Sequence, residues 1–137
     1  MYAVIDSNVY VYRAIEDSEY HRISGELLNT LSKWITPTIV VHEVTWTLME
    51  LIGRKNTILY VKALLSHKKT EVIPVLKQDI SWAIKNIENE KLSLTRYNDK
   101  IILSVIKRIN APLLTFDKQL ISQATRIGVP VINPYLS

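Results

Sequence analysis

The stretch that decides the fold is Tyr2–Asn8, with the sequence YAVIDSN. Tyr, Val and Ile favour strands, and a continuous apolar run suits a strand that is buried on both faces. The pattern therefore predicts a buried strand that ends at Asp6, where Ser7 or Asn8 can cap the helix that follows. Ligands of open parallel sheets bind outside the carboxyl ends of the strands, so Asp6 is a candidate site residue. The alternative is an Asp that only turns the chain or caps a helix.

A second apolar run, Ala111–Phe116, ends in the same way, at Asp117. Shorter strands are predicted at Trp34–Thr36, Thr70–Val75 and Pro130–Ile132. A short helix is predicted after Asp6, and longer helices are predicted at Tyr20–Lys33, Thr38–Ile52 (ended by Gly53), Asn56–His67, Asp79–Lys91, Lys100–Asn110 and Lys118–Ile127. This alternation of strands and helices predicts a single α/β domain, residues 1–137, with a mostly parallel sheet and right-handed crossovers.

The composition excludes several classes of site. The chain has 137 residues, of which 47% are hydrophobic and 22% charged, as in a globular domain. It has no cysteine, which excludes disulfides, thiolate zinc sites and a cysteine nucleophile and favours an intracellular, cytoplasmic protein. The three glycines cannot form a glycine-rich phosphate loop. No signal peptide or membrane span is expected. The net charge of +4 points mildly toward polyanions.

Two further acids are predicted to reach the same edge of the sheet. Asp99, Ile102, Leu103 and Ile106 follow the spacing i, i+3, i+4, i+7, which places Asp99 on the buried stripe of its helix. Glu43 lies beside the apolar stripe of another helix. A charge at such a position is costly unless it is paired or bound to metal. Helix capping by Asp99 and Asp117, and a solvated Glu43, are the alternatives.

Parallel topology brings the carboxyl ends of strands and the amino ends of helices to one edge of the sheet. Several carboxylates gathered there would repel one another unless a cation held them together. Oxygen ligands without His or Cys favour Mg²⁺ or Mn²⁺ over zinc.

Four short motifs resemble the PIN domain family, and most closely its small toxins of the VapC type. In chain order these motifs are Ile5–Asn8, Val41–Val44, Tyr97–Asp99 and Leu114–Asp117. The resemblance implies a three-layer α/β/α fold with a central, mostly parallel sheet. It also implies metal-dependent ribonuclease activity, an antitoxin partner and frequent homodimers. One departure from the family pattern is Lys100, which stands where a small residue usually follows the third acid.

The resemblance also assigns roles to residues. It implies that the catalytic and metal-binding acids are Asp6, Glu43, Asp99 and Asp117. It implies that the residues supporting them or contacting the substrate are Ser7, Asn8 and Thr115. Basic residues near the acids in the sequence are candidate contacts for RNA phosphates, with ordinary surface charge as the alternative: Arg13, Arg96, Lys100 and Lys118.

The remaining aromatic and histidine residues are weaker candidates. A stacking surface or a groove for a partner helix could be built from Tyr10, Tyr12, Trp46 and Tyr97, although packing in the core or in a dimer is the favoured interpretation. Three residues without metal-ligand spacing are interpreted as structural or surface residues: His21, His42 and His67.

The sequence thus predicts a metal-dependent endoribonuclease that is the toxin of a toxin–antitoxin pair. Two alternatives stay open at this point. One is a catalytically silent RNA-binding subunit with the same fold. The other is a different α/β protein with an acidic site, such as a phosphatase or a receiver domain.

Overall fold

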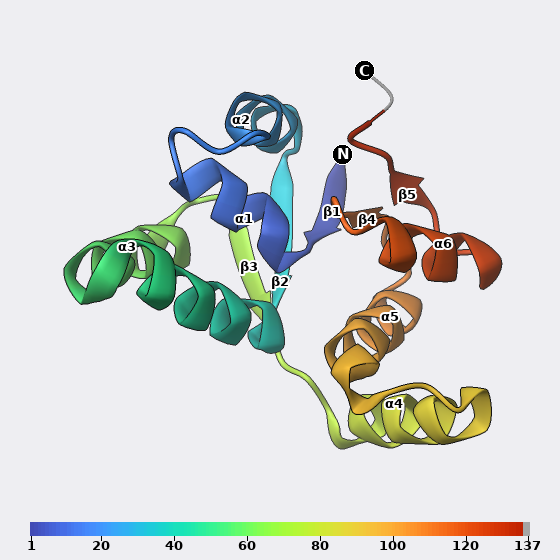
Figure 1. Ribbon diagram of the computed structural model, residues 1–137. Helices are drawn as coiled ribbons and strands as arrows, with labels where there is room; N and C mark the ends of the chain where they lie inside the picture. Colours follow the sequence, from blue (N-terminus) through green and yellow to red (C-terminus); the bar gives the residue numbers. More distant parts are fainter. Residues whose placement is uncertain (136–137) are drawn as a thin grey trace.

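A five-stranded, all-parallel sheet forms the centre of the molecule. The computed structural model describes residues 1–135. The strand order is β3-β2-β1-β4-β5 (Figure 1). The strands are β1 (Tyr2–Ile5), β2 (Lys33–Pro37), β3 (Thr70–Ile73), β4 (Leu113–Leu114) and β5 (Val131–Ile132). The predicted α/β fold with a parallel sheet is confirmed.

The strand predicted from Tyr2–Asn8 is the middle strand of this sheet. It pairs with β2 on one side and with β4 on the other, where Val4 aligns with Leu113 and Ile5 with Leu114. Ala3, Val4 and Ile5 are completely buried. The uninterrupted apolar run is therefore explained by burial on both faces of the strand.

Helices flank the sheet in two groups. They are α1 (Ser7–Ala14), α2 (His21–Thr30), α3 (Thr38–Ser66), α4 (Lys77–Glu90), α5 (Tyr97–Ile109) and α6 (Lys118–Arg126), with a short 3₁₀ helix η1 (Leu94–Arg96) before α5. The chain moves outward from β1 to β3 and then crosses back to β4 and β5. With right-handed crossovers, this reversal places α1–α3 and α4–α6 on opposite faces. Figure 1 shows α1–α3 on the left and α4–α6 on the right.

The reversal makes the boundary between β1 and β4 the topological switch point of the sheet. The two strands lie side by side, and the Asp6 amide donates to the Leu114 carbonyl over 3.0 Å. Asp6 directly follows β1, and Asp117 comes three residues after the end of β4. Ligands of open α/β sheets bind at such a point, outside the carboxyl ends of the strands. The fold therefore brings two of the predicted acids to the expected place.

Several predicted elements differ in detail. The two helices expected at residues 38–52 and 56–67 form one element, α3, which bends at Gly53, where φ is 81° and ψ is 175°. The predicted break is confirmed, but helix resumes without a loop because glycine adopts this positive φ within a single residue. On α3, Leu51 is 57% exposed, whereas Val40 is buried.

The apolar face of α4 is only partly buried. Ala83 and Ile87 are buried together with Asp79, but Ile80 and Ile84 are 44% and 47% exposed. The physical reason is that α4 packs mainly against α5 rather than against the sheet, so a narrower stripe is covered. Within residues 1–135, none of the helices combines the length and the apolar character that crossing a bilayer requires.

Candidate active site

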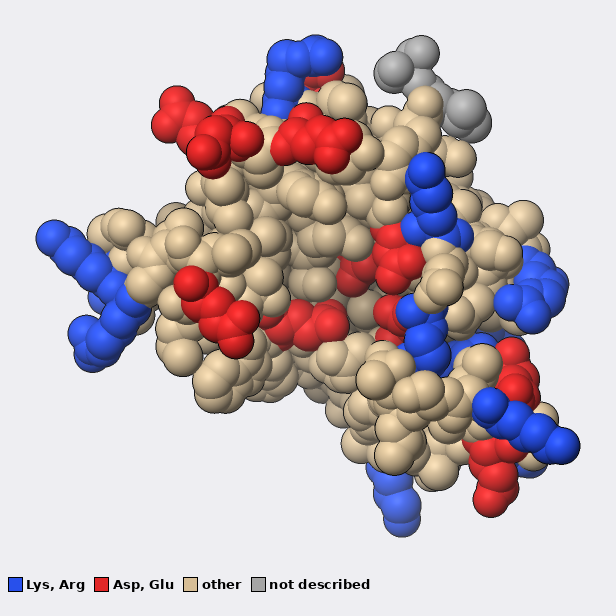
Figure 2. Space-filling view, in the orientation of Figure 1, with Lys and Arg blue, Asp and Glu red and all other residues tan. Residues whose placement is uncertain are grey.

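Acidic side chains gather in a hollow at the carboxyl edge of the sheet. Figure 2 shows these carboxylates between the two groups of helices, with Lys and Arg side chains along one side of the hollow. The four predicted acids come from four different places: Asp6 from the end of β1, Glu43 from the first turns of α3, Asp99 from the first turn of α5, and Asp117 from the start of α6.

Asp6 is buried and is held by three donors. It is the N-cap of α1, and its Oδ1 accepts the Ser7 amide over 2.8 Å. Its Oδ2 accepts the Thr115 hydroxyl over 2.6 Å and the Asn8 amide nitrogen Nδ2 over 3.2 Å. The chain thus fixes this carboxylate from the start of α1 and from the segment after β4.

Asn8 and Thr115 join the ends of the two strands. Asn8 Nδ2 also donates to Thr115 Oγ1 over 3.2 Å, and Asn8 Oδ1 accepts the Phe116 amide over 3.1 Å. The Asp117 amide in turn donates to Thr115 Oγ1 over 3.0 Å. Thr115 leaves the strand ladder to make these contacts, and β4 accordingly ends at Leu114, two residues earlier than predicted.

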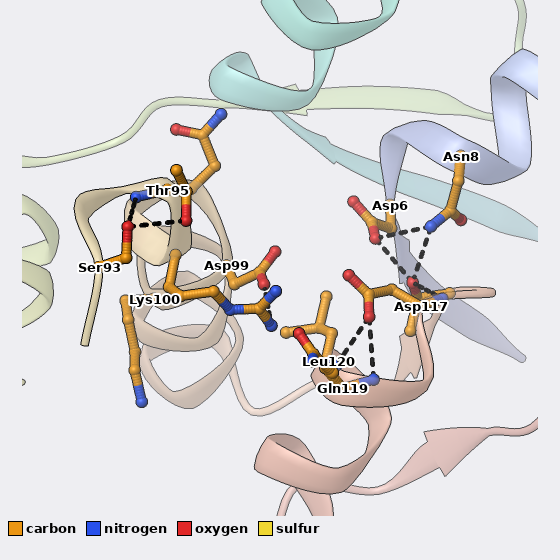
Figure 3. A network of polar contacts seen from close by, with 12 residues as sticks. Asp6, Asn8, Ser93, Thr95, Asp99, Lys100, Asp117, Gln119 and Leu120 are labelled. Atoms are coloured by element: carbon orange, nitrogen blue, oxygen red, sulfur yellow. Dashed lines mark hydrogen bonds and ion pairs between the residues drawn. The ribbon is translucent and has the colours of Figure 1, made fainter. Parts of the chain in front are cut away.

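Asp117 has two roles in the structure. As the N-cap of α6, its Oδ1 accepts the amides of Gln119 over 2.9 Å and Leu120 over 3.2 Å. Figure 3 shows the other carboxylate oxygen turned toward the space between Asp6 and Asp99. The capping role foreseen as an alternative is therefore present together with a position at the site.

Glu43 reaches the site from α3 and contacts a residue that the sequence analysis did not single out. Its Oε2 accepts the Asn98 amide nitrogen Nδ2 over 2.9 Å. Its Oε1 is buried and has no hydrogen-bond partner within residues 1–135. Burial raises the pKa of Glu43, and the charge of Asp99 adds to the effect, whereas Asn98 and the nearby Ser7 side chain offset part of it. The position of Asn98 directly before Asp99 was the available signal.

The pKa of Asp6 is raised from 3.8 to about 6. Burial is the main cause, and the charges of Glu43 and Asp117 add to it. The hydrogen bonds from Thr115 and Ser7 act in the opposite direction and offset only part of the shift. Even with three donors in place, burial and the neighbouring acids disfavour the ionised form of Asp6.

Asp99 is in a similar electrostatic environment. It forms an ion pair with Arg96, with Nη2 and Oδ2 2.6 Å apart. Its pKa is nevertheless raised from 3.8 to about 6, because burial, assisted by the charges of Asp117 and Asp6, outweighs the opposite effect of Arg96 and Lys100. The four acids therefore form one electrostatic cluster.

This cluster fits a hard divalent cation in the kind and charge of its donors. All four side chains are carboxylates, the preferred partners of Mg²⁺ and Mn²⁺, and the orphaned Glu43 Oε1 is a buried acceptor that such an ion would satisfy. Within residues 1–135, however, no three such groups converge closely enough to ligate one ion. The carboxylates instead accept internal donors. Their role as a common ligand set thus stays a prediction.

Two of the four predicted phosphate contacts lie elsewhere. Lys100 is only 4% exposed, and its Nζ bonds Glu90 Oε2 over 2.7 Å, so it is not accessible to RNA in this structure. This ion pair also explains how a lysine is tolerated at a position where a small residue was expected. Arg13 lies at the far end of α1 and contacts His21.

Arg96 and Lys118 keep positions beside the acids. Arg96 is paired with Asp99. Lys118 follows Asp117 directly, and its Nζ lies 4.9 Å from the centre of the Tyr135 ring. These two residues stay candidates for phosphate contacts.

The predicted aromatic surface is not formed as one patch. Tyr10 is fully buried and shares a 2.7 Å hydrogen bond with Thr36. Tyr12 packs edge-on against Tyr20 and Phe116. Trp46 is 65% exposed. Core packing, the favoured interpretation, is therefore confirmed for Tyr10.

The histidines have structural or surface positions. His21 contacts Arg13 and the Tyr12 carbonyl, and His67 stacks on Trp34 with ring centres 4.2 Å apart. His42 is exposed.

The sequence profile of the PIN domain matches residues 3–126. The chain belongs to the PIN domain family. PIN domains are generally nucleases that depend on divalent metal ions. The family assignment decides against the alternative of a phosphatase or receiver domain. No curated protein sequence is similar enough to this PIN domain to count as a match.

Solved structures of low sequence identity share the fold of this PIN domain. The sarcin–ricin loop cleaving toxin VapC20 of Mycobacterium tuberculosis is 13% identical, with a TM-score of 0.81 over 96% of this chain and 99% of that one. FitAcB from Neisseria gonorrhoeae is 16% identical, with a TM-score of 0.71 over all of both chains. VapBC2 from Rickettsia felis, bound to promoter DNA, is 19% identical, with a TM-score of 0.68 over 97% and 98%.

Proposed function

We propose that this PIN domain is a Mg²⁺- or Mn²⁺-dependent endoribonuclease and the toxin of a type II toxin–antitoxin pair. The observation that carries the proposal is the cluster of four carboxylates at the switch point of the sheet, in which burial and the charges of neighbouring acids raise the pKa of Asp6, Glu43 and Asp99. Membership of a nuclease family and similarity in fold to toxins such as VapC20 support it.

Asp6, Glu43, Asp99 and Asp117 would hold the ion. When bound, Mg²⁺ or Mn²⁺ supplies an activated water and neutralises charge on the phosphoryl group that is cleaved. The chain's own contribution is to position the acids. Thr115 fixes Asp6 over 2.6 Å, and the cap of α6 fixes one oxygen of Asp117, so both carboxylates are oriented before substrate arrives.

Two basic residues beside the acids, Arg96 and Lys118, are the proposed contacts for the RNA backbone. The net charge of +4 favours a polyanionic substrate in the same way. We further propose a cytoplasmic site of action, an antitoxin partner and a homodimer. The antitoxin is supported by a solved toxin–antitoxin complex from Klebsiella pneumoniae, which shares the fold at 19% identity with a TM-score of 0.66.

A cleavage assay tests the catalytic part of the proposal. The purified protein is incubated with RNA in Mg²⁺, in Mn²⁺ and in EDTA. We expect cleavage with either ion, none in EDTA, and recovery when the ion is added back. Undiminished cleavage in EDTA would reject the metal mechanism. RNA binding without cleavage in every condition would favour the catalytically silent subunit.

Co-expression tests the antitoxin. The gene beside that of the toxin is expressed together with it, and the complex is purified. We expect a stable complex whose ribonuclease activity is suppressed and returns when the partner is removed by proteolysis. A complex that cleaves RNA as fast as the free protein would reject an inhibitory partner.

A further inference from the structure

Arg96 is the only cationic side chain within residues 1–135 that forms an ion pair with one of the four acids. Its Nη2 lies 2.6 Å from Asp99 Oδ2, and the two side chains are only 23% and 17% exposed. The pair is therefore shielded from solvent, and its attraction is stronger than that of an open surface pair. The site thus contains a positive charge supplied by the chain itself.

Local structure explains why this guanidinium reaches the site. Ser93 caps the 3₁₀ helix η1, because its Oγ accepts the Thr95 amide over 3.2 Å. Arg96 ends η1 and is the residue before α5, so it stands three positions before Asp99. Side chains at this spacing lie on the same side of a helix. The turn therefore delivers the guanidinium directly onto the acid.

The contact is held by charge more than by direction. Nη2 is buried, yet it makes no aligned hydrogen bond within residues 1–135, despite its short distance to Asp99. By contrast, the guanidinium of Arg108 bonds Asp79 and the Pro74 carbonyl with aligned donors. A guanidinium without aligned hydrogen bonds has few such bonds to break when it moves away. Arg96 is therefore easier to displace than Arg108.

A divalent ion and Arg96 would both bind the carboxylate of Asp99. We propose that Arg96 is an exchangeable internal counter-ion, which neutralises Asp99 in the metal-free protein and moves to an RNA phosphate once a metal ion occupies the site. This inference rests on the proposed function. Its physical basis is that guanidinium pairs equally well with carboxylate and with phosphate, so one side chain serves both states.

The exchange predicts opposite effects of one substitution on two affinities. Removal of the guanidinium frees Asp99 for the ion and should tighten metal binding. The same removal takes away a phosphate contact and should weaken RNA binding. A residue with a merely structural role would not change the two affinities in opposite directions.

Isothermal titration with Mn²⁺ tests the first effect. The variants are Arg96→Gln, Arg96→Lys and the control Arg22→Gln, which removes an arginine whose pair with Glu26 is equally short, 2.6 Å, but lies on the surface. We expect Arg96→Gln to bind Mn²⁺ about tenfold more tightly, which corresponds to roughly 1.4 kcal/mol. Arg22→Gln should match the parent. Arg96→Lys should bind Mn²⁺ more nearly like the parent than Arg96→Gln does, because it keeps the positive charge.

The second effect is read from KM for an RNA substrate at saturating Mn²⁺. We expect KM to rise in Arg96→Gln and to stay unchanged in Arg22→Gln. Circular dichroism melts of each variant establish that the proteins compared are folded. An unchanged KM together with tighter Mn²⁺ binding would overturn the transfer of Arg96 to phosphate.

The titration also separates this inference from the proposed function. If parent and Arg96→Gln bind Mn²⁺ equally, while Asp99→Asn does not bind it, Arg96 is not a competing counter-ion and the metal site stands. If none of the proteins binds Mn²⁺, both the counter-ion and the proposed metal mechanism are wrong. Tighter Mn²⁺ binding in Arg96→Gln, but not in Arg22→Gln, supports competition between Arg96 and the ion.

Discussion

Two aspartate–arginine pairs lie in the same half of the molecule and differ in their electrostatics. Asp79 on α4 pairs with Arg108 over 2.9 Å, and Asp99 on α5 pairs with Arg96 over 2.6 Å. The pKa of Asp79 is lowered, whereas the pKa of Asp99 is raised to about 6. An arginine partner alone therefore does not decide whether the pKa of a buried acid is lowered or raised.

The difference lies in the other neighbours of each acid. Burial would raise the pKa of Asp79, but Arg108, the Leu76 amide and the Ser104 hydroxyl together outweigh it. The last two donate over 2.8 Å each. Within residues 1–135, Asp99 is paired with Arg96 alone and faces the charges of Asp117 and Asp6. Asp79, whose oxygens accept several donors, stabilises the packing of α4 against α5. Asp99, which lies among other acids, is the better candidate for binding a ligand.

The largest expected effect is on catalysis. Asp99→Asn should reduce RNA cleavage by at least about 10²-fold, because it removes a charge proposed to position the metal ion. Asp79→Asn should leave cleavage per folded molecule within about threefold of the parent, since that acid fastens α4 to α5 away from the site. Initial rates at saturating Mg²⁺, corrected for folded fraction by circular dichroism, measure both. Equal losses would show that the two pairs do not differ in role.

The second effect reverses the comparison and concerns stability. Asp79→Ala should lower the free energy of unfolding by about 3 kcal/mol, because it leaves Arg108 without its buried partner and Leu76 without its acceptor. Asp99→Asn should lose no stability in EDTA, because it removes a negative charge that burial and the nearby acids Asp117 and Asp6 disfavour. Urea denaturation of the parent and both variants provides the measurement. A greater loss for Asp99→Asn than for Asp79→Ala would contradict this assignment.

The third prediction concerns pH. The pKa values of Asp6 and Asp99 rise from 3.8 to about 6 on folding, so between about pH 4 and 6 the folded state binds more protons than the unfolded chain. Metal-free stability should therefore fall as pH rises through this range, by about 3 kcal/mol for each of the two acids considered alone. Asp79, whose pKa is lowered, acts oppositely: its contribution is present above pH 4 and is lost as pH falls further.

Thermal melts in EDTA across this pH range provide the measurement. The decline should be smaller in Asp99→Asn and unchanged in Arg22→Gln. With saturating Mn²⁺ the slope should reverse, because the ion stabilises the ionised cluster by mass action. If the metal-free stability of the parent increased steadily between pH 4 and 6, the pKa values of Asp6 and Asp99 would not be raised in the folded protein.

The smallest effect separates the two roles of Asp117. Asp117→Asn keeps an efficient cap for α6 and removes one charge, so in EDTA near pH 8 it should melt slightly above the parent and gain less from Mn²⁺. Asp117→Ala should lose about 1 kcal/mol of stability with the cap. If Asp117→Asn melts lower in EDTA and gains as much from Mn²⁺ as the parent, Asp117 is a cap alone.

The sequence by itself determined the order of strands and helices and the approximate place of the candidate site. The run Tyr2–Ile5 predicted the central strand, and the alternation of strands and helices predicted the parallel sheet that the structure contains. Apolar runs that end in acids also identified Asp6 and Asp117, because the end of a buried parallel strand is set by local pattern. The predicted strand end at Phe116 was two residues too late, because Thr115 and Phe116 contact Asp6 and Asn8 and leave the sheet.

Only the tertiary structure decided which partner each charged side chain has. Lys100 stands next to Asp99 in the sequence but pairs with Glu90, and Glu43 meets Asn98 from a distant helix. Asp79 gave no sign of burial in the sequence, yet it is enclosed by Arg108 and Ser104. Periodicity places a side chain on a face of its own element, but the energy of a charge depends on everything packed against that face, and this is fixed only when the chain folds.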